Sequence, residues 1–281
     1  MALRPLPRAA ARLGAEAVSE NFTTSALAAG GGDSARWRRF VDPAVMFVIF
    51  AILWEKAVDV FRIKAYLLPP LSKVLQTIWT SRDLLLRESW ITALEILQGF
   101  AWAMIGGVLL AVAIHGVPTV RRALYPLIVV FQGLPKIALA PLMVIWFGYG
   151  TASKVLMAFL FAFFPVVINT LGGLAGTSPA LLEHFRAIGA SRIVTFRRLL
   201  VPSALPAVLD GARTAMPLAV IGAIVGEFVG SEAGLGHLIL DANANARTDL
   251  LFAALVMVSL IAGALYLLVE LAAKRVWWRA L

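Results

Sequence analysis

Uncharged apolar runs along the chain mark candidate membrane helices. Residues 155–174 and 250–269 are each twenty residues without a charge. About 20 apolar residues rising about 1.5 Å each are enough to cross roughly 30 Å of hydrocarbon. Residues 90–114 and 123–147 are longer and contain one charged residue each. The pattern therefore predicts four membrane-spanning helices in these stretches.

Two weaker segments complete the pattern. Segment 203–229 has an uncharged stretch of only thirteen residues, and segment 43–60 has twelve before Glu55. The second segment fits a buried or interfacial helix as well as it fits a membrane span. Counted as spans, both make the predicted fold an all-α integral membrane protein with six transmembrane helices. The predicted spans are residues 43–60, 89–114, 122–147, 154–174, 205–229 and 249–271.

The composition agrees with lipid as the solvent for most of the chain. Of 281 residues, 60% are hydrophobic and 15% are charged, against about 45–50% and about 25% in soluble domains. The net charge of +9 comes from short basic clusters between apolar runs, which argues against nucleic acid as a partner. With both termini in the cytosol, inside segments hold fifteen Lys and Arg and outside segments hold six. The positive-inside rule favours this orientation in the cytoplasmic membrane.

The segments around the spans have simple expected roles. Residues 1–40 are basic and glycine-containing without a long apolar core, and are expected to form a disordered cytosolic arm. After a proline pair, residues 72–86 are expected to form an amphipathic helix on the outer membrane surface. Residues 88–272 then form one membrane domain. The chain has no cysteine, and its three histidines lack a carboxylate cluster at metal spacing, so no metal site is expected.

The longest internal loop on the cytosolic side, residues 178–202, predicts a helix, a glycine turn and a second helix. Ser178 followed by proline is typical of a helix start, and Gly189 can adopt the positive φ that ends a helix. Ser191 then caps the second helix, which Pro202 closes. Two interpretations are open. The loop is either an amphipathic connector on anionic headgroups or a surface that docks into a cytosolic partner.

This loop resembles the cytoplasmic loop of type I ATP-binding-cassette (ABC) importer permeases. In that family it runs Glu-Ala-Ala, three residues, Gly, nine residues, Ile, one residue, Leu-Pro. The family positions are held here, in order, by Glu183, His184, Phe185, Gly189, Leu199, Val201 and Pro202. Bulkier side chains thus replace the two alanines, so this copy departs from the family on its packing surface.

Three further stretches resemble the nitrate, sulfonate and taurine branch of that family, which also includes permeases for vitamin precursors. They are Leu68-Pro69-Pro70-Leu71-Ser72, Pro135-Lys136 running on to Trp146-Phe147-Gly148, and Gly226-Glu227 followed by Gly234-Leu235-Gly236. The resemblance covers roughly residues 45–275. It implies the type I ABC importer permease fold with a cytosolic coupling helix.

The resemblance implies a transmembrane permease subunit that forms the path for a small organic or anionic solute. Two copies of this chain, two cytosolic ABC ATPases and an extracytoplasmic solute-binding protein would form the importer. The chain contains no G-x-x-x-x-G-K-[S/T] phosphate loop, so no cofactor is expected in it and ATP is expected to be hydrolysed by the ATPase subunit. The residues implied in coupling to the ATPase are Glu183, Phe185, Arg186, Gly189, Ala190, Ser191 and Pro202.

Polar residues inside the spans are the candidates for the solute path: Lys136, Gln132, Glu95, Asn169 and Glu227. A lysine at the centre of a span costs about 2.5–3.5 kcal/mol. Lys136 is therefore expected either to attract solute, to pair with Glu95 or Glu227, or to hold carbonyls freed by nearby prolines. For Asn169, a hydrogen bond between helices is expected more often than a contact with the solute. Asp210 and Arg213, three residues apart, predict a local ion pair.

Two other classes of protein explain the sequence less completely than a permease. An ion-gradient-driven secondary carrier explains the spans and the buried charges but not the loop. A membrane-embedded enzyme needs a nucleophile with a base, or metal ligands, at one depth, and the sequence shows neither. The sequence therefore favours a non-enzymatic permease. It does not identify the solute, because a separate binding protein takes part in selecting the solute.

Overall fold

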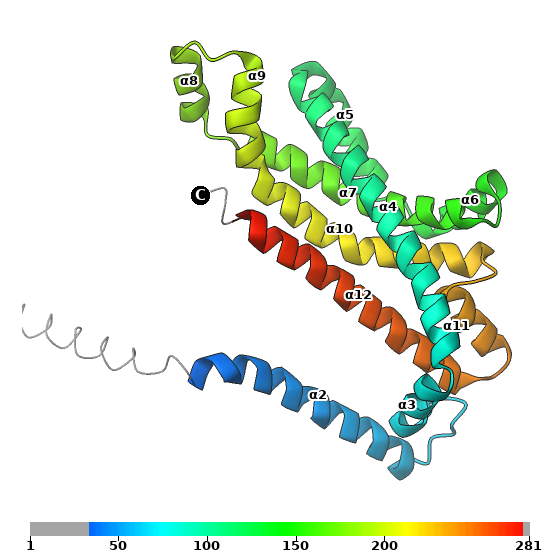
Figure 1. Cartoon of the computed structure of the whole chain (residues 1–281). Coiled ribbons are helices and arrows are strands. Elements are labelled where there is room, and N and C mark those ends of the chain that lie inside the picture. The colour runs from blue at the N-terminus through cyan, green and yellow to red at the C-terminus, as the bar shows by residue number, and fades with distance from the viewer. Residues whose placement is uncertain (1–33, 278–281) are drawn as a thin grey trace, which may run out of the picture. The chain divides into compact units, whose positions relative to one another are not determined.

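The long uncharged runs of the sequence form helices. The computed structural model describes residues 34–277, and this part of the chain contains no β-strand. Four helical segments in it are long and apolar enough to cross a membrane. They contain the helices α4 (Arg82–Gly116), α7 (Thr151–Ala175), α10 (Val201–Gly230) and α12 (Thr248–Trp277) (Figure 1). Each coincides with a predicted span.

The span predicted at residues 122–147 is a bent pair of helices. The pair consists of α5 (Pro118–Gln132) and the segment formed by η2 (Lys136–Leu139) and α6 (Ala140–Phe147). Its two parts meet at an angle of 85°, and counting the pair as one span raises the total to five. Pro135 lies at the break. Proline disfavours helical geometry in the residue before it and provides no backbone N–H, so the helix ends there.

The first candidate span is helix α2 (Ser34–Val60). It belongs to a separate compact unit, Met1–Ile63, whereas Lys64–Leu281 form the second unit. Exposed apolar residues cover α2 from Val45 to Leu53. However, α2 is not among the helices that are long and apolar enough to cross a membrane. The assignment of residues 43–60 as a span therefore stays a prediction. The helix begins within the predicted disordered arm, most of which lies outside the described residues.

The predicted surface helix at residues 72–86 is wrong in its extent. Helix α3 (Leu71–Thr80) ends before Ser81, and the residues after it already belong to α4. Thr80 Oγ1 donates to the carbonyl oxygens of Gln76 and Thr77. Ser81 has φ −105° and ψ 19°, outside the helical range. Local side-chain bonds of this kind compete with a continuing helix, so the chain turns from α3 directly into the first long span.

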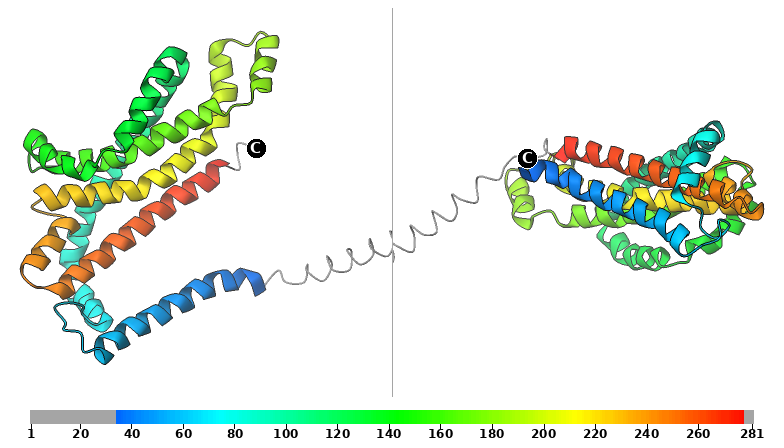
Figure 2. Two further views of the ribbon diagram at one scale, coloured as in Figure 1. Left: turned by 180° about the vertical axis from the view of Figure 1, so that it is seen from behind. Right: turned by 90° about the horizontal axis from the view of Figure 1, so that it is seen from below.

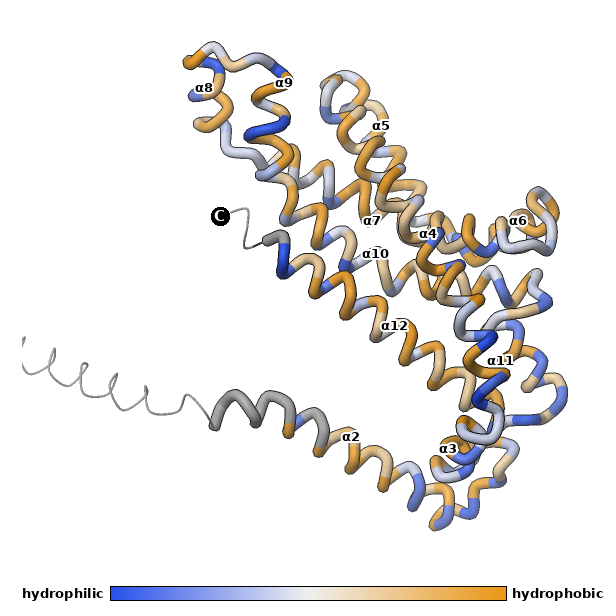
Figure 3. The backbone as a smooth tube through the Cα atoms, in the orientation of Figure 1, coloured by the Kyte–Doolittle hydropathy of each residue, from blue (hydrophilic) through white to orange (hydrophobic). Residues whose placement is uncertain are grey.

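Helix α7 is the central helix of the second unit. It packs along both α4 and α10, and α12 packs against α10 (Figures 1 and 2). In the most apolar 18-residue stretch of α7, 50% of the residues are buried, whereas only 17% are buried in the corresponding stretch of α12. Large exposed apolar residues instead occur along α4, α5 and α12, and much of these helices has hydrophobic colouring in Figure 3. This distribution fits a bundle whose outer faces contact lipid or another apolar surface, because protein interiors bury such side chains.

Small residues line the contacts of α7 with its neighbours. A Cβ atom added at Gly222 of α10 would lie 2.6 Å from the carbonyl oxygen of Met157 and 2.8 Å from Ala158 Cα. One added at Gly99 of α4 would lie 2.7 Å from the carbonyl oxygen of Val155. Small residues let helix backbones approach closely inside membranes, where packing rather than the hydrophobic effect drives association. The glycines therefore set the spacing of the three-helix core.

Candidate functional site

The loop between α7 and α10 has the predicted helix, glycine turn and helix. Its first helix is α8 (Pro179–Ala187) and its second begins with α9 (Arg192–Thr195). Gly189 adopts φ +70°, and its N–H donates to the carbonyl oxygen of Arg186 over 3.0 Å. Ser191 caps the second helix by accepting the N–H of Val194 over 3.3 Å. These two local predictions are confirmed.

The two outer ends of the loop differ from the prediction. Ser178 precedes α8 without a side-chain hydrogen bond to it. Pro202 does not close the second helix, because α9 continues through the π-helical turn η3 (Phe196–Leu200) into α10. A wide π turn loosens the backbone spacing before the proline, which would clash with the carbonyl four residues back in a regular α-helix. The loop is therefore continuous with the membrane helix and can transmit a displacement to it.

Exposed apolar and charged side chains make up the surface of this loop, called here the loop surface. Helix α8 buries no residue. Leu181 is 47% exposed, Ile188 62% and Ile193 70%. The remaining coupling candidates are exposed or half-buried: Glu183, Phe185, Arg186, Ala190, Ser191 and Pro202. His184 and Phe185, which replace the alanines of the family pattern, pack edge to face at 6.5 Å between ring centroids. A solvated helix of this kind gains stability only when something covers its apolar side.

Two of the solute-path candidates, Glu95 and Glu227, lie together in the interior. Their exposed fractions are 2% and 1%. Glu227 on α10 accepts a hydrogen bond from Thr92 Oγ1 over 2.6 Å and another from the N–H of Gly236. Gly236 belongs to the first turn of α11 (Leu235–Ala244). Glu227 thus links α10 to α4, which is distant in sequence, and to α11, which follows α10 in the chain.

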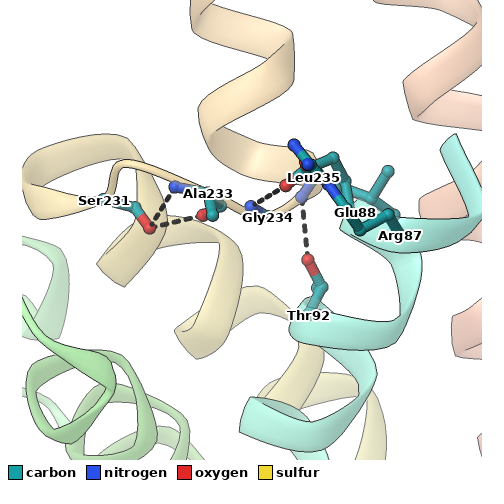
Figure 4. Close-up of polar contacts among 7 residues, drawn as sticks. All are labelled: Arg87, Glu88, Thr92, Ser231, Ala233, Gly234 and Leu235. Carbon is teal, nitrogen blue, oxygen red and sulfur yellow. Dashed lines mark hydrogen bonds and ion pairs between the residues drawn. The ribbon is translucent and has the colours of Figure 1, made fainter. Parts of the chain in front are cut away.

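The N-terminus of α11 is capped by side chains of α4 (Figure 4). The N–H of Gly234 donates to Glu88 Oε2 over 2.6 Å, and the N–H of Leu235 donates to Thr92 Oγ1 over 2.8 Å. Together with Glu227, these groups satisfy backbone donors that have no partner within a helix. Carboxylates also interact favourably with the positive end of the helix dipole.

Close approach to Glu227 explains two glycines of the 226–236 stretch, Gly234 and Gly236. Gly234 has φ +103°, and a Cβ added there would collide with the carboxylate of Glu227. One added at Gly236 would lie 2.7 Å from Glu227 Oε2. Sequence reasoning missed Glu88 and Thr92. They precede Glu95 by seven and three residues, a spacing that places all three on one helix face, and this signal could have identified them.

Lys136 lies at the bend and contacts aromatic rings. Its Nζ is 5.0 Å from the ring centroid of Phe164 and 5.7 Å from that of Phe161, both on α7. In the part of the chain that the structure describes, Lys136 forms no ion pair, so the predicted pairing with Glu95 or Glu227 is wrong. The lysine that interacts with these carboxyl groups is Lys154, a buried residue of α7 that sequence reasoning missed. A cation over ring faces is stabilised by the ring quadrupole.

The other polar candidates do not join these sites. Gln132 is exposed at the end of α5. Asn169 Nδ2 donates to the carbonyl oxygen of Pro165 in its own helix over 2.9 Å, so the predicted bond between helices is wrong. Arg213 pairs with Asp210 over 2.7 Å, as predicted, and also with Glu270 of α12 over 2.7 Å. The five candidates thus divide among separate places.

Comparison with known proteins identifies the family. "Binding-protein-dependent transport system inner membrane component" is the family that matches residues 103–278. The formylaminopyrimidine transport permease protein ThiX of Halalkalibacterium halodurans is 41% identical over 70% of this chain and 79% of its own length. The riboflavin transport system permease protein RibX of Chloroflexus aurantiacus is 35% identical over 83% and 90%. The taurine transport system permease protein TauC of Escherichia coli is 28% identical over 76% and 80%.

The fold agrees with this family. An inward-facing structure of the MetNI methionine ABC transporter aligns with a TM-score of 0.56 at 20% identity, over 70% of this chain and 98% of that chain. The resemblance in the loop and in the three further stretches is confirmed at the level of the family. The chain belongs to the binding-protein-dependent inner membrane components, the permease subunits of ABC importers.

Proposed function

We propose that this permease is driven through its α8–α9 loop by an ABC ATPase on the cytosolic side. The supporting observation is the loop surface: a short helix with no buried residue, apolar side chains open to solvent, and a direct helical connection into α10. Amphipathic helices of this kind bind by placing the apolar side in a groove and charges on its rim. The ATPase hydrolyses ATP, and the permease itself carries out no chemistry.

The complete importer contains two copies of this chain, two ATPases and an extracytoplasmic binding protein. Family membership supports the ATPase and the binding protein as partners, and both termini then lie in the cytosol. An ion-gradient-driven carrier has no support in the family. The solute is a small organic or anionic molecule. Because the relatives with higher identity are named for formylaminopyrimidine and riboflavin, a nitrogen heterocycle is the first class to test.

Charge placed on the loop surface tests the docking. In the double variant Leu181→Glu and Ile188→Glu, the ATPase subunit should no longer co-purify with the permease from detergent extracts, because ionised groups would enter an apolar groove. Leu75→Glu is the matched control: Leu75 is 57% exposed on α3, at the opposite end of the second unit (Figure 1). This control should retain the ATPase.

Two outcomes of that experiment contradict the proposal. The ATPase could remain bound to the double variant, with ATP-dependent uptake intact. Alternatively, the double variant could keep the ATPase but lose binding to vesicles of anionic lipid, which would identify the loop as a membrane connector. Each variant is first shown to give the same yield of monodisperse permease as the wild type, so that misfolding is excluded.

Lys136 is the proposed contact for an anionic group of the solute. Replacing it with methionine removes the positive charge at the bend and the attraction that goes with it. We expect Lys136→Met to slow uptake by about fivefold or more, the equivalent of about 1 kcal/mol. Lys136→Arg keeps both the charge and the interaction with Phe161 and Phe164, and should transport near the wild-type rate. Uptake by proteoliposomes containing ATPase and binding protein measures both. Equal rates for the methionine and wild-type proteins would leave Lys136 a structural role only.

A further inference from the structure

Four ionisable side chains are buried together where α4, α7 and α10 meet, and they are called here the buried acid cluster. They are Glu88, Glu95, Lys154 and Glu227, each at most 4% exposed. Three carboxyl groups and one ammonium group occupy this interior. Charges buried away from water are costly unless each is paired. The number and placement of the partners therefore determine which groups can be ionised.

Glu88 has its own partner at the edge of the cluster. Arg87 Nη2 lies 2.8 Å from Glu88 Oε1, and Gly234 N–H donates to the other carboxylate oxygen over 2.6 Å. The side chain of Arg87 is largely exposed, so this pair connects the cluster to solvent. Both oxygens of Glu88 accept hydrogen bonds, which is the arrangement of an ionised carboxylate.

Lys154 can balance only one of the two remaining carboxyl groups. It interacts electrostatically with Glu95, Glu227 and the exposed Glu232, and its Nζ donates to the carbonyl oxygen of Tyr149. Glu227 accepts from Thr92 and from Gly236 through its two different oxygens. It also lies at the N-terminus of α11, where negative charge is stabilised. Glu227 is therefore the ionised member of the pair.

Glu95 has the opposite surroundings. Its Oε2 is buried with no hydrogen-bond partner among the described residues, and its carboxyl group is hydrogen-bonded to that of Glu227. Ionised carboxylates only accept hydrogen bonds. A bond between the two groups therefore requires a proton, and two carboxylates that share a site do not both ionise. An ionised Glu95 would also be a second buried negative charge without a donor.

We propose that Glu95 is a protonated carboxylic acid that donates its proton to Glu227, and that this buried proton joins α4 to α10 inside the membrane domain. The charges of the cluster and of Arg87 then cancel, because the positive charges of Lys154 and Arg87 balance the negative charges of Glu227 and Glu88. Because Glu227 also binds the first turn of α11, the same proton helps to hold α11 in place. This inference is independent of the loop surface and of the solute.

The test compares two isosteric variants in purified, detergent-solubilised permease. The amide of Glu95→Gln can donate to Glu227 in place of the proton, so its melting temperature should lie within a few degrees of the wild type. Glu227→Gln presents an NH₂ group where only acceptors fit, opposite the donors Thr92 and Gly236. It should melt clearly lower than Glu95→Gln.

Infrared spectroscopy detects the proton directly. The wild-type protein at neutral pH should show a C=O stretching band of a protonated carboxyl group, shifted in D₂O and absent from Glu95→Gln. Two results would overturn the proposal. One is an unchanged protonated-carboxyl region in Glu95→Gln. The other is a loss of folding in Glu95→Gln as large as in Glu227→Gln, since the neutral amide would then fail to replace the group that it mimics.

Discussion

Replacing Gly222 with leucine should prevent this permease from folding into a monodisperse protein. The added Cβ would lie 2.6 Å from the Met157 carbonyl oxygen and 2.8 Å from Ala158 Cα. Both atoms belong to the backbone of the central helix α7 and cannot rotate away as a side chain can. Overpacking typically lowers the free energy of unfolding by about 1–3 kcal/mol. A collision with backbone atoms should cost at least the upper end of this range. The measurement is size-exclusion chromatography of the detergent-solubilised, fluorescently tagged variant.

A second glycine separates this packing effect from the general effect of leucine. A Cβ added at Gly263 of α12 would meet no atom within 4 Å. Leucine also has a higher helix propensity than glycine, by up to about 1 kcal/mol. Gly263→Leu should therefore be produced in wild-type amount and melt no lower than the wild type. If Gly222→Leu matched Gly263→Leu in yield and melting temperature, the close contact of α7 with α10 would not exist in the folded protein.

Uncharged run length predicted the long helices well because crossing the membrane restricts helix length and composition directly. The weakest prediction among the four long helices was the segment that became α10, whose uncharged stretch is short. The structure explains this: Arg213 pairs with Glu270 as well as with Asp210. One of the two carboxylates that balance the charge of Arg213 lies on α12. A pairing between distant helices leaves no local pattern in the sequence.

Local backbone rules succeeded and failed within the same loop. The positive φ of Gly189 was predictable because few residues other than glycine adopt it. The helix end at Pro202 was wrong because a π turn next to the proline removes the clash on which the rule depends. Similarly, Glu227 was recognised as a polar residue in a span, but its partners come from α4 and α11. Only their packing together brings Glu88, Thr92 and Gly236 to one place.

Gly189→Val should uncouple ATP hydrolysis from transport while leaving the membrane domain folded. Gly189 has φ +70° and no atom within 4 Å of an added Cβ, so valine meets no steric obstacle, only an unfavourable backbone conformation. Left-handed backbone costs an L-residue roughly 1–2 kcal/mol, and more for a β-branched one. If the ATPase binds the turn in this conformation, its affinity should fall by about 5–30-fold, the factor that corresponds to 1–2 kcal/mol.

Gly172→Val isolates the effect of the positive φ. Gly172 on α7 also has open space around an added Cβ, but it lies within a regular helix, where valine adopts its ordinary conformation. Both variants should give wild-type yields of monodisperse permease, because neither creates a clash in the core. In proteoliposomes with ATPase and binding protein, only Gly189→Val should lose uptake, and raising the ATPase concentration should restore part of it. Equal uptake by the two variants would mean that the loop does not need its glycine turn to engage the motor. If Gly189→Val lost uptake and more ATPase did not restore it, the defect would lie after ATPase binding, in the transmission of movement from α9 through η3 into α10.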